Sequence, residues 1–380
     1  MQKSRSIHKP KLAIVRTSGI PVRSGFYNFQ EVGLAKAVAK EGWSCDVFTA
    51  SPTKKFYVTK AAPSVRVFHL PYYRFLGDQG VFPGLLTLLR QGEYQIVQVQ
   101  EHWQYTSITV AREVSKWGIP VILGQGKYHD NVGPRRVQIM LMDALGVPVL
   151  RKSIKYALCK TKAAADYLRK KGFTKITVLP IGLDTDRFTI SYQKSSQQST
   201  VFRLLYVGNI QKPKQVPFLV ELMDYLLRQG ADVKLQVVGD GRDIKKCVHI
   251  AKERNLSDRV EFVGKVMQSD LPRHYIQADC LLLPTYSEIY GMVLLEAMYF
   301  GLPVIASHAA GPDDIVSPGV DGYLMKGFNI NDWAEAVLSL INDPDKHKMM
   351  SEATKKKIRE RLTWDALAPR YAEFYESLLR

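Results

Sequence analysis

Long hydrophobic runs are absent from this chain of 380 residues. No stretch of about 18 apolar residues occurs, so the sequence predicts no transmembrane helix. The basic amino terminus, MQKSRSIHKP, leads directly into the short apolar segment KLAIV. It lacks the apolar core of about 7 to 15 residues that a secretory signal needs. We therefore expect a cytoplasmic protein, either free or docked on the inner face of the plasma membrane.

Cysteine is also scarce, and its spacing excludes two kinds of site. Cys45, Cys159, Cys247 and Cys280 lie far apart among apolar neighbours. This spacing matches neither zinc ligation nor a disulfide framework, and it indicates buried free thiols in a reducing compartment. The eight histidines include no pair at metal-ligand spacing, so we expect no metal site. Asp184 and Asp186 form an Asp-x-Asp sequence, but its place after a predicted strand favours a turn and helix cap.

Acidic residues are few in the first half of the chain. Residues 1–180 carry 28 Lys and Arg against 10 Asp and Glu, whereas residues 181–380 carry 25 against 26. The net charge of +17 therefore belongs to the first half. Such asymmetry points to an anionic partner: a membrane surface, a phosphorylated acceptor or a nucleic acid. No recognition helix, aromatic RNA-binding strip or zinc pattern supports nucleic acid, so we expect none.

Two series of alternating apolar strands and helices are present, and they predict an α/β fold of two doubly wound, Rossmann-like domains facing across a cleft. The first domain spans residues 1–185. A polar stretch without periodicity, SYQKSSQQST, indicates a linker at 191–200. The second domain spans 200–364, and a carboxyl-terminal helix at about 365–380 is expected to pack back on the first.

The segment CLLLPTYSEIYGMVLLEAMYFGLPVIA, residues 280–306, is the most informative. A strand ends at Pro284, a loop carries Glu288, and Gly291 precedes a helix that holds Glu296. A carboxylate can accept hydrogen bonds from sugar hydroxyls, while the amides and dipole of a helix amino terminus suit a diphosphate. Lys214, in the segment VGNIQKPKQ, could neutralise the phosphates.

The ordered motifs from residue 201 to 325 resemble the second domain of the family-4 retaining glycosyltransferases of GT-B fold. They include VVGDG (237–241), FVG (262–264), GPDDIV (311–316) and DGYL (321–324). The spacing from Glu288 to Glu296 matches the paired glutamates of that family. In the first half the resemblance is looser, through SGFYNFQEVGLAKAVAKEGWSCDVFTA and LPIGLDTDRF.

The resemblance implies roles for individual residues. Glu288 would contact the donor sugar, Glu296 the ribose, and Lys214 the diphosphate, while Gly25 would let a helix amino terminus approach the phosphates. The remaining donor-binding candidates are Gly208, Asn209, Lys212, Gly239, Gly264, Lys265, Val266, Tyr290, Gly291, Met292 and Val293.

Three departures from the family pattern affect the reacting centre. Asn209 stands where the family usually has Arg, and Gln98 and Gln100 replace a His-x-His pair. Gln125 and Gly126 precede His129 where the family often has a His. Candidates for a catalytic base are Glu101, His102 and His129.

The resemblance thus implies a metal-independent hexosyltransferase that needs no cofactor and uses a UDP- or GDP-linked sugar as co-substrate. Lys214 and helix amides would stabilise the leaving diphosphate. We expect a glycan or lipid-linked acceptor, in cell-surface polysaccharide or glycolipid assembly. The aromatic segment 71–92, with its nearby Arg and Lys residues, is either internal packing or a lip that contacts an anionic bilayer. The alternatives are an epimerase- or phosphorylase-like enzyme of the same fold and a basic nucleic-acid-binding protein.

Overall fold

A computed structural model describes residues 9–22, 29–75, 77–130, 136–188 and 201–380. The chain divides into two compact units. Unit 1 comprises Met1–Asp184 together with Trp364–Arg380, and unit 2 comprises Thr185–Thr363. The linker predicted at 191–200 lies outside the described residues. Each unit is an α/β body built on a mainly parallel sheet, in agreement with the predicted fold class.

Within the described part of unit 1, eight strands form one sheet in the order β10-β9-β8-β7-β1-β2-β4-β3. Every neighbouring pair is parallel except β3 and β4. The inner strands are almost wholly buried, as expected when helices cover both faces. The strands are β1 (Lys11–Val15), β2 (Ser44–Ala50), β3 (Tyr57–Ala62), β4 (Val65–Leu70), β7 (Ile96–Gln100), β8 (Val121–Gln125), β9 (Tyr156–Cys159) and β10 (Ile176–Val178).

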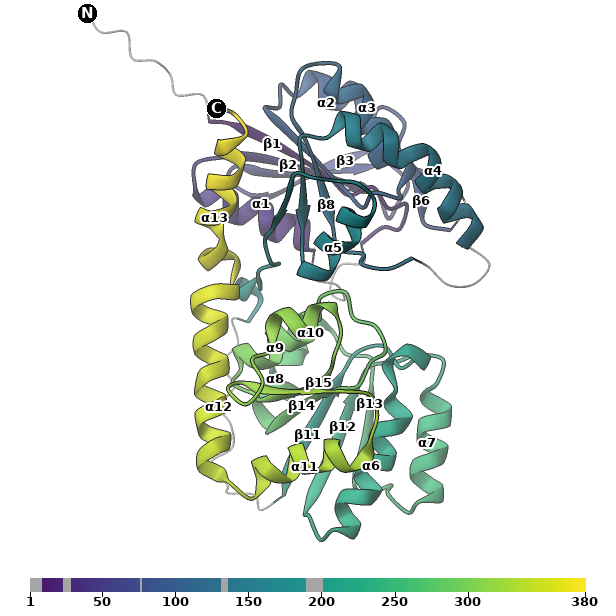
Figure 1. The fold of residues 1–380 in the computed structure, drawn as a ribbon, viewed down its shortest axis with the longest axis vertical. Coiled ribbons are helices and arrows are strands. Elements are labelled where there is room, and N and C mark those ends of the chain that lie inside the picture. The colour runs from purple at the N-terminus through teal and green to yellow at the C-terminus, as the bar shows by residue number, and fades with distance from the viewer. Residues whose placement is uncertain (1–8, 23–28, 76, 131–135, 189–200) are drawn as a thin grey trace, which may run out of the picture. The chain divides into compact units, whose positions relative to one another are not determined.

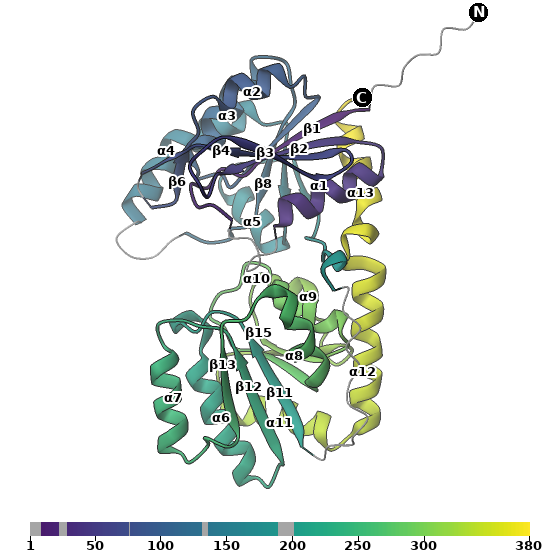
Figure 2. The same cartoon turned by 180° about the vertical axis from the view of Figure 1, so that it is seen from behind.

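The helices of unit 1 include one from the end of the chain. In both views α13 lies beside α1, and the two helices are in contact (Figures 1 and 2). Trp364 at the start of α13 packs against Gly33, where a Cβ atom would lie 2.1 Å from the indole Nε1. Tyr375 donates a hydrogen bond to Gln98 Oε1 at 2.7 Å. The helices are α1 (Gln30–Lys40), α2 (Leu85–Gln91), α3 (Tyr105–Ser115), α4 (Arg136–Ser153), α5 (Lys162–Lys170) and α13 (Trp364–Ser377).

The segment 71–92 has two different parts. Strands β5 (Tyr73–Phe75) and β6 (Gln79–Val81) form a hairpin with exposed aromatic side chains. The following residues Phe82, Leu85 and Leu89 are buried in the core of unit 1. Among the described residues of this segment, the exposed aromatic side chains are Tyr73 and Phe75 of the hairpin. Among the described residues, no helix is long and apolar enough to cross a membrane.

The described part of unit 2 contains a six-stranded, all-parallel sheet in the order β13-β12-β11-β14-β15-β16. The strand order reverses between β11 and β14, and ligands of such sheets bind beyond the carboxyl ends of the strands at this point. The strands are β11 (Phe202–Val207), β12 (Val233–Val238), β13 (Val260–Gly264), β14 (Cys280–Leu283), β15 (Val304–Ser307) and β16 (Gly322–Met325).

Helices connect these strands, and short turns precede some of them. All four cysteines are buried free thiols, as the sequence predicts. The α-helices are α6 (Val216–Arg228), α7 (Ile244–Glu253), α8 (Leu271–Gln277), α9 (Met292–Tyr299), α10 (Ala310–Ile315), α11 (Ile330–Ile341) and α12 (Pro344–Lys357). The short 3-10 turns are η1 (Thr185–Arg187), η2 (Lys212–Lys214) and η3 (Gln268–Asp270), and η4 (Ile358–Leu362) is a π-helix after α12.

Candidate functional site

Two loops meet beyond the carboxyl ends of β11 and β14 in unit 2. The backbone N–H of Tyr286 donates to the carbonyl of Pro213 at 2.9 Å, and the Thr285 hydroxyl donates to the same carbonyl at 3.1 Å. The Thr285 hydroxyl also lies 2.9 Å from the carbonyl of Ser287. These bonds hold the η2 turn against the loop that carries Glu288, at the switch point of the sheet.

Lys214 and Glu288 form an ion pair across these loops. The Lys214 Nζ lies 2.5 Å from Glu288 Oε2, and their side chains are 18% and 19% exposed. The other carboxylate oxygen, Oε1, accepts a hydrogen bond of 3.4 Å from the Tyr290 amide. The structure therefore places the predicted sugar-binding carboxylate and the predicted phosphate-binding ammonium side by side, partly open to solvent.

Helix α9 begins directly after this pair. Gly291 precedes it with φ of +88°, a left-handed conformation that favours glycine. Gly291 has no side chain that could cap the first turn of α9, so among the described residues the amides of Met292 and Val293 are left for solvent or a ligand. The positive end of the helix dipole thus points to the neighbourhood of Glu288 and Lys214.

Glycines allow the loops at this sheet edge to approach closely. A Cβ atom on Gly239 would lie 1.9 Å from the carbonyl oxygen of Gly208, and one on Gly311 would lie 1.9 Å from the carbonyl oxygen of Tyr290. A larger residue at either position would push the loops apart. Gly208, Gly239 and Gly264 all have positive φ, at +154°, +144° and +81°.

Glu296 lies inside α9, where it is 4% exposed. Its Oε2 accepts a hydrogen bond of 2.7 Å from the Tyr275 hydroxyl. Burial raises the pKa of Glu296 to about 7, against the lowering effect of hydrogen bonds from Tyr275 and Gln268 and of the Arg187 charge. The buried carboxyl group therefore holds its proton more tightly than a solvent-exposed glutamate does.

The other predicted donor-binding residues lie at the same edge of unit 2. Asn209, Lys212 and Lys265 are exposed, and Val266 is half-buried. The Tyr206 hydroxyl donates to the carbonyl of Asn209 at 2.8 Å and fixes the backbone beyond β11. Gly25 lies outside the described residues.

The candidates for a base lie beyond the carboxyl ends of β7 and β8 in unit 1. Glu101 has φ of +64°, an uncommon conformation for a residue with a side chain. Its carboxylate accepts amide hydrogen bonds from Gly126 at 2.9 Å and Lys127 at 3.3 Å. The strand ends thus hold a half-buried carboxylate in one orientation.

His102 is enclosed, with 1% of its surface exposed. Its Nδ1 lies 3.1 Å from Gln125 Oε1, and its Nε2 lies 3.1 Å from Asp143 Oδ1. Both ring nitrogens therefore face groups of the protein. His129, by contrast, is exposed, and its Nδ1 lies 2.9 Å from the carbonyl oxygen of Asp130.

Sequence reasoning did not single out Lys127, which the structure places next to Glu101 and His102. Lys127 is 7% exposed, its Nζ has no hydrogen-bond partner among the described residues, and the ammonium lies 5.0 Å from the centre of the Trp103 ring. Burial lowers the pKa of Lys127, while the nearby carboxylates of Asp130, Asp143 and Glu101 oppose this effect. The sequence signal was a lysine in the loop after the predicted strand 120–124.

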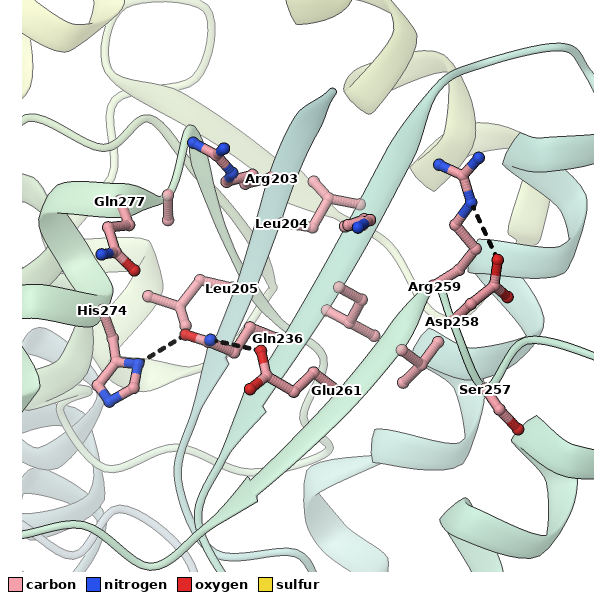
Figure 3. Close-up of a pocket in the computed structure, with 14 residues that line it drawn as sticks. Arg203, Leu204, Leu205, Gln236, Ser257, Asp258, Arg259, Glu261, His274 and Gln277 are labelled. Carbon is pink, nitrogen blue, oxygen red and sulfur yellow. Dashed lines mark hydrogen bonds and ion pairs between the residues drawn. The ribbon is translucent and has the colours of Figure 1, made fainter. Parts of the chain in front are cut away.

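A hollow of about 540 Å³ lies elsewhere in unit 2. Figure 3 shows Gln236 between His274 and Glu261, with hydrogen bonds of 2.6 Å to His274 Nδ1 and 2.7 Å to Glu261 Oε2. The hollow is lined by the amino-terminal halves of β11 and β12, from Arg203 and Lys234 onward, and by the start of β13 at Val260. The Lys214–Glu288 pair lies at the carboxyl ends, where ligands of parallel sheets bind.

Two α/β units, each built on a mainly parallel, doubly wound sheet, define a two-domain Rossmann-like architecture. The family model "Glycosyl transferases group 1" matches residues 188–357, and the model "Glycosyltransferase Family 4" matches residues 32–187. The chain belongs to the family-4 glycosyltransferases of GT-B fold, and it is a glycosyltransferase of the hexosyltransferase type.

Curated relatives and solved structures agree with this assignment. D-inositol 3-phosphate glycosyltransferase of Xylanimonas cellulosilytica is 25% identical over 393 aligned positions, which cover 93% of this chain and 91% of that protein. N-acetyl-α-D-glucosaminyl L-malate synthase of Bacillus anthracis is 29% identical over 177 residues, which cover 47% of this chain and 46% of that protein.

Two solved structures show the same fold over nearly their whole length. Sucrose-phosphate synthase from Thermosynechococcus elongatus has a TM-score of 0.80 at 20% identity, with 97% of this chain and 99% of that chain covered. Anabaena HepE in complex with UDP has a TM-score of 0.74 at 18% identity, with 97% and 100% covered.

Proposed function

We propose that the chain is a retaining, metal-independent transferase that moves a sugar from a UDP- or GDP-linked donor to a glycan or lipid-linked acceptor. The observation that carries this proposal is the Lys214–Glu288 ion pair beside the uncapped amino terminus of α9. A carboxylate, an ammonium and free amides in one place suit a ligand that is a polyol at one end and an anion at the other.

Donor binding would replace the ion pair between Lys214 and Glu288 by contacts of each residue with the donor. Glu288 would accept hydrogen bonds from sugar hydroxyls, and Lys214 with the first amides of α9 would receive the diphosphate. Glu296 would accept the ribose hydroxyls, and residues after Gly264 would line the base. The structurally similar HepE was solved with UDP, so uridine nucleotides are the first probes to use.

The reaction would proceed by loss of the diphosphate from the anomeric carbon. The bond from that carbon to the phosphate oxygen breaks as the bond to the acceptor hydroxyl oxygen forms on the same face. The acceptor proton passes to the leaving phosphate oxygen. Lys214 and the α9 amides would stabilise the charge that develops on this oxygen, and no separate base is then needed.

The acceptor would bind unit 1, beyond the carboxyl ends of β7 and β8. Glu101 is held there by two backbone amides and is half-buried, so it is the candidate for contact with acceptor hydroxyls. The enclosed His102 would position Gln125 and the loop after β8. The basic first half of the chain would hold the enzyme at an anionic membrane surface, where lipid-linked acceptors lie.

Thermal unfolding with a panel of nucleotides and nucleotide sugars, each with and without EDTA, tests the proposal. Binding to the folded state alone raises stability by about 2.7 kcal/mol at a ligand concentration of roughly 100 times Kd. We expect a shift with one UDP- or GDP-sugar that EDTA does not change. The anomeric configuration of the product, read by NMR, then tests retention. No shift with any ligand of the panel would refute donor binding. A shift that EDTA abolishes would refute metal independence, and an inverted product would refute retention.

A further inference from the structure

Helix α4 of unit 1 exposes an apolar face. Val137, Met140, Leu141 and Leu145 are 66%, 59%, 60% and 74% exposed. Their spacing of three and four residues places them on one side of the helix. In unit 2, by contrast, the exposed apolar residues Val320 and Met349 have no exposed apolar neighbour in the sequence, which is ordinary for a protein surface.

The opposite side of α4 is packed inside unit 1. Val147 and Leu150 belong to its core. A Cβ atom on Gly146 would lie 2.3 Å from Ile108 Cδ1, so α4 approaches α3 closely. In both views α4 lies at the edge of unit 1 (Figures 1 and 2). The apolar stripe is therefore a fixed feature of the folded unit and not the face that holds the helix in place.

A basic hollow continues the stripe at the carboxyl end of α4. It has a volume of about 610 Å³, begins at Pro148, and is lined by Arg151, Lys152, Lys155 and Lys175. No acidic side chain is among the described residues that line it. At 100° per residue, Arg151 and Lys152 fall on the same helix face as Val137 and Leu141. They lie roughly 9 to 10 Å beyond Leu145 along the axis, at 1.5 Å per residue.

We propose that this face of α4, the stripe together with the basic hollow, docks on an anionic lipid surface. The stripe would enter the boundary between headgroups and acyl chains, and the hollow would hold a lipid phosphate. A helix with this pattern lies on a bilayer and does not span it.

The charge of the hollow argues against two other occupants. A second copy of the chain in a two-fold dimer would place one basic hollow near another, because the same patch serves both subunits. A nucleic acid would match the cations, but its phosphate backbone offers nothing to the four exposed apolar side chains. An anionic bilayer satisfies both parts of the surface.

This docking surface rests on the proposed function only for its purpose, which is to bring the enzyme to a lipid-linked acceptor. Binding itself can be measured without transfer. Flotation of the full chain with vesicles of phosphatidylcholine, alone or mixed with phosphatidylglycerol, gives the partition coefficient. We expect binding to the anionic vesicles only, and weaker binding at higher salt.

Variants then separate the stripe from the hollow. L141E/L145E should lower partition at least about tenfold by placing charges in the boundary region. R151Q/K152Q should lower it roughly 30-fold, since each cation near the surface strengthens binding about fivefold. The matched controls V320E/M349E and K245Q/K246Q change exposed residues of the same kinds in unit 2 and should bind as the wild type does.

Four results would overturn the proposal. Two concern lipid binding: equal binding to both kinds of vesicle, and unchanged partition of both α4 variants. Two concern other occupants: a concentration-dependent dimer that L141E/L145E abolishes, and retention on nucleic acid that exceeds retention on vesicles. The donor-induced thermal shift should be the same in L141E/L145E and the wild type, which shows that the variant is folded. A protein that binds vesicles but shows no shift with any nucleotide sugar would refute the proposed function and leave this surface standing.

Discussion

Lys214 and Glu288 are 74 residues apart in the chain and meet in an ion pair of 2.5 Å. Their side chains keep 18% and 19% of their surface exposed, so solvent and a ligand can both reach the pair. Partly exposed ion pairs contribute little to stability. The proposed donor site gives the pair a role that its small contribution to folding does not.

Replacing Lys214 by methionine should slow transfer with little loss of stability. Removal of one group that stabilises developing charge typically costs about 10² to 10³ in rate. We expect K214M to lower kcat/KM by this factor, measured as donor consumption with acceptor at saturation. K245Q, on the exposed side of α7, is the matched control. Wild-type rates for K214M at saturating donor would contradict the assigned role.

Glu296 should make stability depend on pH. Its pKa rises from 4.5 to about 7 on folding, so the folded state holds the proton more tightly than the unfolded state. The contribution of Glu296 to stability is then largest below pH 4.5 and is lost as the pH rises through about 7. The loss amounts to about 3 kcal/mol. E296Q removes it.

The measurement for Glu296 is the urea midpoint of wild type and E296Q at pH 5 and pH 8. The gain from E296Q should be larger at pH 8. E261Q, which changes an exposed glutamate in the same unit, should show no such difference. An equal gain for E296Q at both pH values would mean that the carboxylate is not destabilised by burial.

Gly311 should be needed for the shape of the donor loop. An alanine Cβ there would lie 1.9 Å from the Tyr290 carbonyl oxygen, so the loop from Glu288 to Gly291 must move. We expect G311A to lose about 1 to 3 kcal/mol of stability and to weaken the donor-induced thermal shift. G319A is the control, since its Cβ would meet nothing within 4 Å although its φ is +77°. It should lose stability and keep the donor shift.

The second unit could be predicted well because its signals are local. Apolar strands such as Cys280–Leu283 are buried throughout, and glycines end the neighbouring strands. Loops that follow parallel strands must lie at one sheet edge, so the strand pattern places Lys214 and Glu288 at the same edge. The roles assigned to the two residues came from the family resemblance.

The first unit was harder to predict because its features depend on distant partners. The edge strand β3, with the sequence YVTKAA, is largely exposed and pairs antiparallel, so it shows no apolar run. A carboxyl-terminal helix was expected to pack on this unit, but its contact of Trp364 with Gly33, across more than 300 residues, was not. Asp143 reaches His102 from α4, a helix that the sequence pattern did not indicate. No short-range rule brings such side chains together.

Lys127 should destabilise the folded state at neutral pH. Burial lowers the pKa of Lys127 in the folded state. The folded state therefore binds the ammonium proton less tightly than the unfolded state does. The cost is present at neutral pH and disappears as the pH rises towards 10.5. K127M keeps the length of the side chain and the contact with Trp103. We expect it to raise the urea midpoint at pH 7 relative to wild type, with a smaller gain at pH 10. A lower midpoint at pH 7 would mean that Asp130, Asp143 and Glu101 stabilise the ammonium by more than burial costs.

His102 should position its neighbours and should not act as the base. Both its nitrogens face protein groups, at 3.1 Å from Gln125 and 3.1 Å from Asp143, and it is 1% exposed. A base must have a free nitrogen within reach of the acceptor hydroxyl. H102N should therefore lose about 1 to 3 kcal/mol of stability, because buried polar partners are left unsatisfied. The fall of kcat/KM at low pH should keep the midpoint of the wild type.

H274N removes the buried histidine beside Gln236 in unit 2 and controls for the loss of stability. If H102N abolished the fall at low pH while H274N did not, His102 would be the base and the proton would not pass directly to the leaving phosphate.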